Sequence, residues 1–144
     1  MEIHKLAHYS IRTYDLDASR KFYQNIMGMR EGYRPPFKFP GIWFYLGEDE
    51  SDFGVVHIIG IDENDPSGLQ EYLGDKTDLE GTGTVDHIAF ISTGLKKFHE
   101  TLRAENWTWT DRTVPSLGLH QVFVTDPSGV VIEMNFPAEE AKDI

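Results

Sequence analysis

Val130-Val-Ile-Glu-Met-Asn-Phe136 is an apolar run with one carboxylate, Glu133, at its centre. The preceding segment, Asp126-Pro-Ser-Gly129, has proline and glycine where a tight reversal needs them, so we predict a strand that leaves a turn. An unpaired carboxylate is very costly in apolar surroundings. Glu133 therefore requires a polar partner or a metal ion.

Three histidines occupy comparable positions, within or at the start of strand-like runs. They are His8 in Leu-Ala-His-Tyr-Ser-Ile, His57 in Val-Val-His-Ile-Ile and His87 in Asp-His-Ile-Ala-Phe-Ile. Three imidazoles and one carboxylate are a suitable ligand set for a divalent transition metal, and such a set accepts Zn, Ni, Co, Fe or Mn alike. We expect His8, His57, His87 and Glu133 to bind one such ion.

Composition excludes several classes of partner. The 144 residues carry a net charge of −11, with a pI near 4.8, which argues against nucleic acid and anionic membranes. There is no cysteine, so disulfides, thiolate ligands and a cysteine nucleophile are excluded. The N-terminus shows no signal-peptide pattern, and no apolar run approaches membrane-spanning length. We expect a soluble cytoplasmic protein that binds a small molecule.

An order of strand, helix and three further strands occurs twice. The first copy has a strand at 3–13, a helix from the cap Asp15 to about Met27, a loop or ragged strand at 30–40, and strands at 42–46 and 54–60. The second has a strand at 85–92, a helix at 95–104 and strands at 107–112, 120–125 and 130–136. We predict an α+β fold of two βαβββ modules, 1–66 and 85–137, joined by a linker, 67–84, and followed by a polar tail, 138–144. The modules would form one compact domain, with helices on the outside of a concave sheet.

This repeat puts the four metal-ligand candidates at corresponding positions. His8 and His57 are 49 residues apart, and His87 and Glu133 are 46 apart. The match is imperfect, because His57 follows its glycine by three residues and Glu133 follows its own by four. Equivalent positions in two modules are nevertheless a route by which four side chains converge on one point.

Three further polar residues have alternative interpretations. Arg12 shares a strand face with His8 and needs an anionic partner, either a substrate carboxylate or an internal acid. His120 opens a strand, and it either lines the pocket or is an edge histidine. His99 stands among Lys96, Lys97 and Glu100 and is expected to be solvated. Arg12 and His120 are the candidate substrate contacts.

Several motifs together resemble the vicinal oxygen chelate superfamily. They are His8-Tyr-Ser-Ile-Arg12 followed by Asp15-Leu16 and Phe22-Tyr23, then Asp86-His87-Ile-Ala, then Asp126-Pro-Ser-Gly129 ending at Glu133. That superfamily includes glyoxalase I, methylmalonyl-coenzyme A epimerase, extradiol dioxygenases, and fosfomycin and bleomycin resistance proteins. The resemblance implies paired βαβββ modules cupped around a metal held by His8, His57, His87 and Glu133, and it implies a homodimer.

The resemblance favours a metal-dependent lyase or isomerase of the glyoxalase type. The metal would act as a Lewis acid on a small oxygen-chelating substrate, and Glu133 would be the base that forms an enolate or enediolate. Arg12 matches an arginine that holds glutathione in glyoxalase I. His57, however, stands where glyoxalase I has a glutamate and the epimerase a glutamine.

Two alternatives remain open. One is an extradiol-type dioxygenase with Fe(II), in which His8, His87 and Glu133 would be the two-histidine, one-carboxylate triad. Against it, Phe123 replaces that family's tyrosine, and His57 would add a ligand beside the triad. The other is a non-catalytic resistance module that sequesters a ligand. The intact ligand set argues against this second alternative.

Overall fold

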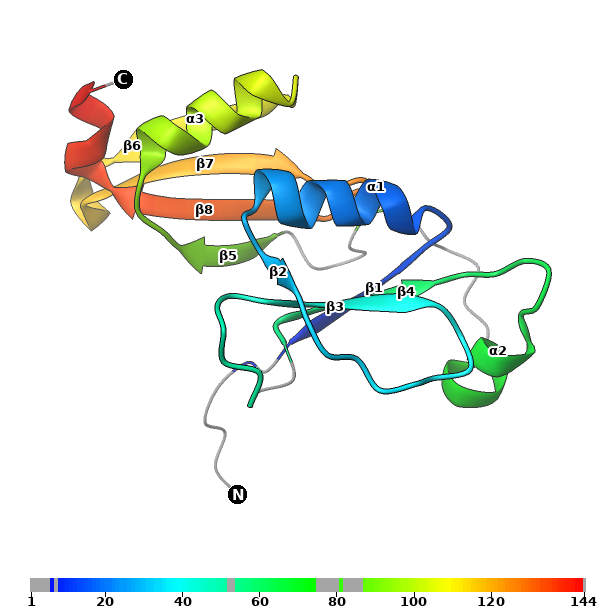
Figure 1. The fold of residues 1–144 in the computed structure, drawn as a ribbon. Coiled ribbons are helices and arrows are strands. Elements are labelled where there is room, and N and C mark those ends of the chain that lie inside the picture. Colours follow the sequence, from blue (N-terminus) through cyan, green and yellow to red (C-terminus); the bar gives the residue numbers. More distant parts are fainter. Residues whose placement is uncertain (1–5, 7, 52–53, 75–80, 82–86, 144) are drawn as a thin grey trace. The chain divides into compact units, whose positions relative to one another are not determined.

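The computed structural model describes residues 6, 8–51, 54–74, 81 and 87–143 and divides the chain into two compact units, Met1–Leu79 and Glu80–Ile144 (Figure 1). The beginning of the strand that we expected at 3–13 lies outside the described residues, as do most of residues 75–86 of the expected linker and second module. Each unit contains one four-stranded sheet.

The first unit has the predicted strand and helix order. Its elements are β1 (Tyr9–Thr13), α1 (Leu16–Lys21) continued by the π-helical η1 (Phe22–Ile26), β2 (Arg30–Glu31), β3 (Gly41–Tyr45), β4 (Val56–Gly60) and α2 (Ser67–Leu73). The strand order in the sheet is β1-β4-β3-β2, with β1 parallel to β4 and the other pairs antiparallel.

The second unit repeats this arrangement. Its elements are β5 (Ile88–Ile91), α3 (Leu95–Ala104), β6 (Trp109–Val114), η2 (Pro115–Leu117), β7 (Leu119–Thr125), β8 (Val131–Pro137) and η3 (Ala138–Asp143). The strand order β5-β8-β7-β6 again places a parallel pair beside two antiparallel pairs. The predicted α+β fold of two βαβββ modules is confirmed. Within the tail that we predicted to be polar, residues Ala138–Asp143 form the 3-10 helix η3.

Two aspartate side chains cap the start of α1 and stabilise the turn before β8. The Asp15 side chain accepts a hydrogen bond from the Ala18 amide at 2.9 Å and caps α1. Asp126 Oδ1 accepts from the amides of Ser128 and Val130, at 2.9 and 2.8 Å, and holds the turn before β8. These contacts confirm the predicted helix cap and the predicted turn.

One face of each sheet packs against its own helix. In the first unit the rings of Tyr23 and Phe44 lie 5.3 Å apart, and both side chains are fully buried. In the second unit the ring of Phe98 on α3 lies 5.7 Å from that of Phe136 on β8. Because side chains alternate along a strand, the residues between these core positions point to the other face of each sheet. The predicted metal ligands are among those residues.

Among the described residues, no helix combines the length and the apolar character needed to cross a membrane.

Candidate metal centre

The first unit brings His8 and His57 together. His57 in β4 pairs with Ser10 in β1, and His8 precedes Ser10 by two residues, so the two imidazoles share one sheet face. Their rings stack with centroids 3.9 Å apart, and Trp43 of β3 stacks on the other side of His57 at 4.0 Å. His57 is buried, whereas His8 is exposed. Solvent therefore reaches the His8 imidazole at the outside of this stack.

The second unit brings His87 and Glu133 together. His87 Nε2 lies 3.3 Å from Glu133 Oε2. The other carboxylate oxygen, Oε1, accepts hydrogen bonds from Gln121 Nε2 at 2.9 Å and from Asn135 Nδ2 at 2.7 Å. Glu133 is 6% exposed, which confirms the expected buried carboxylate and shows how it is compensated. Two amides hold one oxygen in place and leave the other directed at His87.

Strand register makes the two pairs equivalent. Glu133 pairs with Ala89, and His87 precedes Ala89 by two residues, as His8 precedes the partner of His57. The antiparallel neighbours also correspond, because Trp43 pairs with His57 and Phe123 with Glu133. The offset of one residue that we counted from the glycines therefore disappears when strand pairing is used as the reference.

The donor set in each unit fits a divalent transition metal. Each unit offers two nitrogen or oxygen ligands, a buried one on a strand and a solvent-reached one directly before the parallel neighbouring strand. Ligating carboxylates are usually hydrogen-bonded by surrounding side chains, as Glu133 is by its two amides. Imidazole and carboxylate are ligands that Zn, Mn, Fe, Co and Ni all accept.

Arg12 lies on the same sheet face as His57. It pairs with Ile59 in β4, two positions beyond the pair formed by Ser10 and His57. Its Nη1 donates to the Gly74 carbonyl at 3.1 Å. It also lines a cavity of about 280 Å³ in the first unit, together with Tyr14, Ile61, Asp62, Glu63, Pro66, Leu69, Gln70 and Gly74. A ligand in this cavity would contact the guanidinium.

His120 does not join the surface around Glu133. It follows Leu119 in β7 and precedes Gln121, whose side chain reaches Glu133, so His120 points to the opposite face. Its strand lies between β6 and β8, which also excludes an edge position. His120 Nδ1 lies 2.9 Å from Thr113 Oγ1. The pocket-lining and edge interpretations of His120 both fail at this position.

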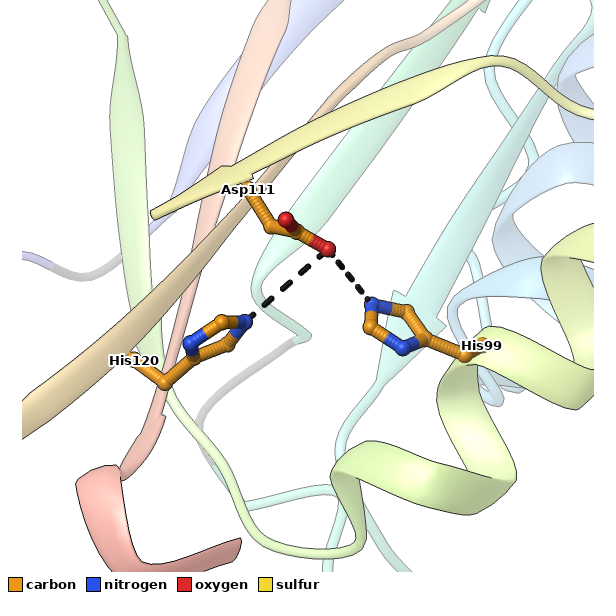
Figure 2. A group of neighbouring side chains, drawn as sticks. All are labelled: His99, Asp111 and His120. Carbon is orange, nitrogen blue, oxygen red and sulfur yellow. Dashed lines mark ion pairs between the residues drawn. The ribbon is translucent and has the colours of Figure 1, made fainter. Parts of the chain in front are cut away.

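The expectation that His99 is solvated is wrong, because it is only 3% exposed. It lies four residues after Leu95 and three before Leu102, on the face of α3 that packs against the sheet. Its Nε2 lies 3.1 Å from Asp111 Oδ2, and His120 Nε2 lies 3.9 Å from the same oxygen. Figure 2 shows the three side chains, from α3, β6 and β7, pointing toward one another.

Burial sets the protonation of His99. It lowers the pKa of the imidazole by more than the nearby Asp111 charge raises it, and the charges of Arg103 and His120 lower it further. His99 is therefore neutral near pH 7. Sequence reasoning missed this cluster, although the helical spacing from Leu95 would have placed His99 on the buried face.

Comparison with known proteins agrees with this architecture. The model of the family described as "Glyoxalase/Bleomycin resistance protein/Dioxygenase superfamily" matches residues 5–134. A "Probable lactoylglutathione lyase" of Vibrio cholerae is 28% identical over 139 residues, which cover 93% of this chain and 91% of that protein.

Solved structures show the same fold. A glyoxylase/bleomycin resistance protein/dioxygenase domain from Frankia sp. EAN1pec has 18% identity and a TM-score of 0.67, over 94% of this chain and 93% of that one. A mutant of the fosfomycin resistance protein FosX from Listeria monocytogenes has 17% identity and a TM-score of 0.66, over 98% of both chains. The latter was crystallised with Mn(II) and 1S,2S-dihydroxypropylphosphonic acid.

Proposed function

The chain belongs to the glyoxalase/bleomycin resistance protein/dioxygenase superfamily, and from this premise we propose that it is a metal-dependent lyase or isomerase of the glyoxalase type. Its substrate would be a small molecule with two neighbouring oxygens, converted through an enolate or enediolate. The observation that carries the proposal is the carboxylate of Glu133, with one oxygen held by two amides and the other beside His87.

In this proposal His8, His57, His87 and Glu133 hold one divalent metal ion. The ion would supply a Lewis acid that lowers the energy of negative charge developing on a substrate oxygen. The equivalence of the two pairs in strand register supports a shared role. A relative of the same fold was crystallised with Mn(II), which supports a metal without identifying the one used here.

Glu133 would take the proton from the carbon next to the substrate's carbonyl group. It carries the only carboxylate among the four proposed ligands, and a positioned carboxylate base contributes roughly 10²–10⁴-fold to such a step. Because Gln121 and Asn135 both donate to Oε1, the proton would be received at Oε2, after that oxygen has loosened from the ion. The amides thereby decide which oxygen is basic.

Arg12 would bind an anionic end of the substrate. Its position on the His57 face and its exposure to the neighbouring cavity support this role. A guanidinium there presents several donors to a carboxylate or phosphate.

Phe123 favours proton transfer over oxygen insertion. It lies directly opposite Glu133 in the strand pairing, and its ring is edge-on to His87 with centroids 6.2 Å apart. A phenylalanine at this position offers no hydroxyl to protonate a ring-cleavage intermediate.

We also propose that the protein is a homodimer, because each sheet has two edge strands and pairing of subunits is a common way to protect such edges. Sedimentation at micromolar concentration should give twice the 16.5 kDa mass of the chain. A monomer would contradict this proposal. The cytoplasmic location stays a prediction from the sequence.

The function is tested by hydrogen exchange into substrate. The metal-loaded protein is incubated without oxygen in deuterated water with a panel of α-oxo thiol adducts and acyl-coenzyme A compounds. We expect enzyme-dependent deuterium at the reacting carbon, reduced at least a hundredfold in Glu133→Gln and unchanged in the control Glu139→Gln. Absence of exchange with every substrate, together with oxygen-dependent cleavage of a catechol by the iron-loaded protein, would replace the proposal with the dioxygenase.

A further inference from the structure

We propose that His99, Asp111 and His120 form a second divalent-metal site, which takes Zn²⁺ and ties α3 to β6 and β7. This cluster shares no residue with the proposed centre at His57 and Glu133. It also lies on the opposite face of the second sheet from Glu133, the face that packs against α3. The proposal is independent of the function suggested above.

The spacing of the three ligand atoms suits a tetrahedral ion. One nitrogen or oxygen from each residue lies within 4.8 Å of the others. Bonds of about 2.0–2.1 Å at tetrahedral angles put ligand atoms roughly 3.4 Å apart. The distances from Asp111 Oδ2 to His99 Nε2 and to His120 Nε2, 3.1 and 3.9 Å, lie on either side of that value.

Buried nitrogens at this site lack hydrogen-bond partners. Within the part of the chain that the structure describes, His99 Nδ1, His99 Nε2 and His120 Nε2 are inaccessible to solvent and have no hydrogen-bond partner. Both Nε2 atoms approach the carboxylate of Asp111 without hydrogen-bond geometry. Buried polar groups are rarely left in this state, because desolvation is costly. A metal ion between the two Nε2 atoms and the carboxylate would satisfy both.

Thr113 and Trp109 orient the three proposed ligands. Thr113 Oγ1 can accept a hydrogen bond from His120 Nδ1–H at 2.9 Å, which leaves the Nε2 lone pair directed at the site. Trp109 stacks on His99 with centroids 5.4 Å apart, and its Nε1 donates to Asp111 Oδ2 at 3.3 Å. Trp109 therefore orients one ligand by ring contact and another by a hydrogen bond.

The chemistry of the set favours Zn²⁺. Two imidazoles and one carboxylate are borderline-soft and hard donors, a combination that zinc accepts, with water as the fourth ligand. The Asp111 side chain is 36% exposed, so water can reach the site from its side.

The test uses a His57→Gln/Glu133→Gln background, in which the other proposed centre is disabled. After chelator treatment this protein is titrated with Zn²⁺, and with Co²⁺ as a spectroscopic probe. We expect one ion per chain, a tetrahedral Co²⁺ absorption band, and quenching of Trp109 fluorescence by Co²⁺ that Trp109→Phe removes. Zn²⁺ at a hundred times its Kd should raise Tm by about 5–10 °C.

Asp111→Asn in the same background should abolish the stoichiometric binding, the Co²⁺ band and the Tm shift. Glu100→Gln removes the same charge from an exposed position next to His99 on α3 and should change none of them. His99→Gln, with its fold checked by circular dichroism, provides a second loss variant. The absence of stoichiometric Zn²⁺ binding in the background protein, or its persistence in both loss variants, would overturn the proposal.

Discussion

Replacement of Gln121 by leucine should lower both the stability of the fold and the affinity for the metal. The Gln121 amide donates to Glu133 Oε1 at 2.9 Å and to Asn135 Oδ1 at 3.1 Å, and its oxygen accepts from Arg112 Nε at 2.8 Å. Gln121→Leu removes all three contacts while nearly preserving side-chain volume. A buried hydrogen bond to a charged group contributes about 1.5–3 kcal/mol, and a leucine at this position buries additional apolar surface in partial compensation.

We therefore expect the metal-free Gln121→Leu protein to lose about 1.5–3 kcal/mol of stability, the range for the hydrogen bond to Glu133, with the added apolar burial placing the loss toward the lower end. Its metal affinity should fall by about 10–100-fold, because loss of a side chain that orients a ligand typically has that effect. Urea unfolding measures the first quantity, and calorimetric titration of the chelator-treated protein measures the second.

Val122→Ala is the matched control. Val122 is the next residue in β7, fully buried, and points to the opposite face from Glu133. Removal of its methyl groups should destabilise the fold by a comparable 1–3 kcal/mol without changing metal affinity. If both variants lower the affinity equally, or if Gln121→Leu leaves it within twofold, the amide does not position the carboxylate.

Three other perturbations test separate features. Burial raises the pKa of the Tyr45 hydroxyl, and the negative charge of Glu50 raises it further. As pH rises above about 10, this tyrosine therefore loses its proton in the unfolded chain before it does so in the folded one. The free energy of unfolding should then fall by up to about 1.4 kcal/mol per pH unit. Tyr45→Phe should remove this alkaline slope in urea titrations, whereas replacing the exposed Tyr14 should not. The Glu140 carboxylate accepts hydrogen bonds from two amides at the start of α3, at 2.7 and 2.8 Å. Glu140→Ala should therefore lower the free energy of unfolding by about 1 kcal/mol, the value for loss of a helix cap, and an unchanged free energy in urea unfolding would refute the cap. Arg12→Gln should raise KM about tenfold with kcat unchanged, and an unchanged KM would remove Arg12 from the substrate site.

Local patterns predicted those elements whose apolar spacing is regular. The bounds expected for α3, 95–104, agree with the structure because Leu95, Phe98 and Leu102 recur at helical intervals. The same spacing includes His99, but its charged neighbours in the sequence suggested a solvated position. On a helix, neighbours in sequence point in different directions, so the intervals of three and four residues were the better guide.

Pairing between distant strands was less accessible from sequence. Strand alternation indicated which face His57 and Glu133 occupy, but their partners come from register between strands more than forty residues apart. The amides around Glu133 belong to two strands, and no single run of sequence reveals that Gln121 and Asn135 converge on one oxygen. The sequence showed the tail only as polar, because Glu140 finds its partners, the amides at the start of α3, far away in the chain.

The parallel pair at one edge of each sheet has a kinetic consequence. Tyr9 pairs with Val56 and Ile88 with Ile132, so each unit closes a chain loop of 56 − 9 = 47 or 132 − 88 = 44 residues. Such distant pairings are slow to form, because the entropy of loop closure must be met before the contacts can stabilise it. In each unit one proposed ligand directly precedes the first strand, and the other lies on the last strand. A bound ion would then act as a reversible cross-link, and amide protons of β1 and β5 should exchange with solvent more slowly in the metal-loaded protein.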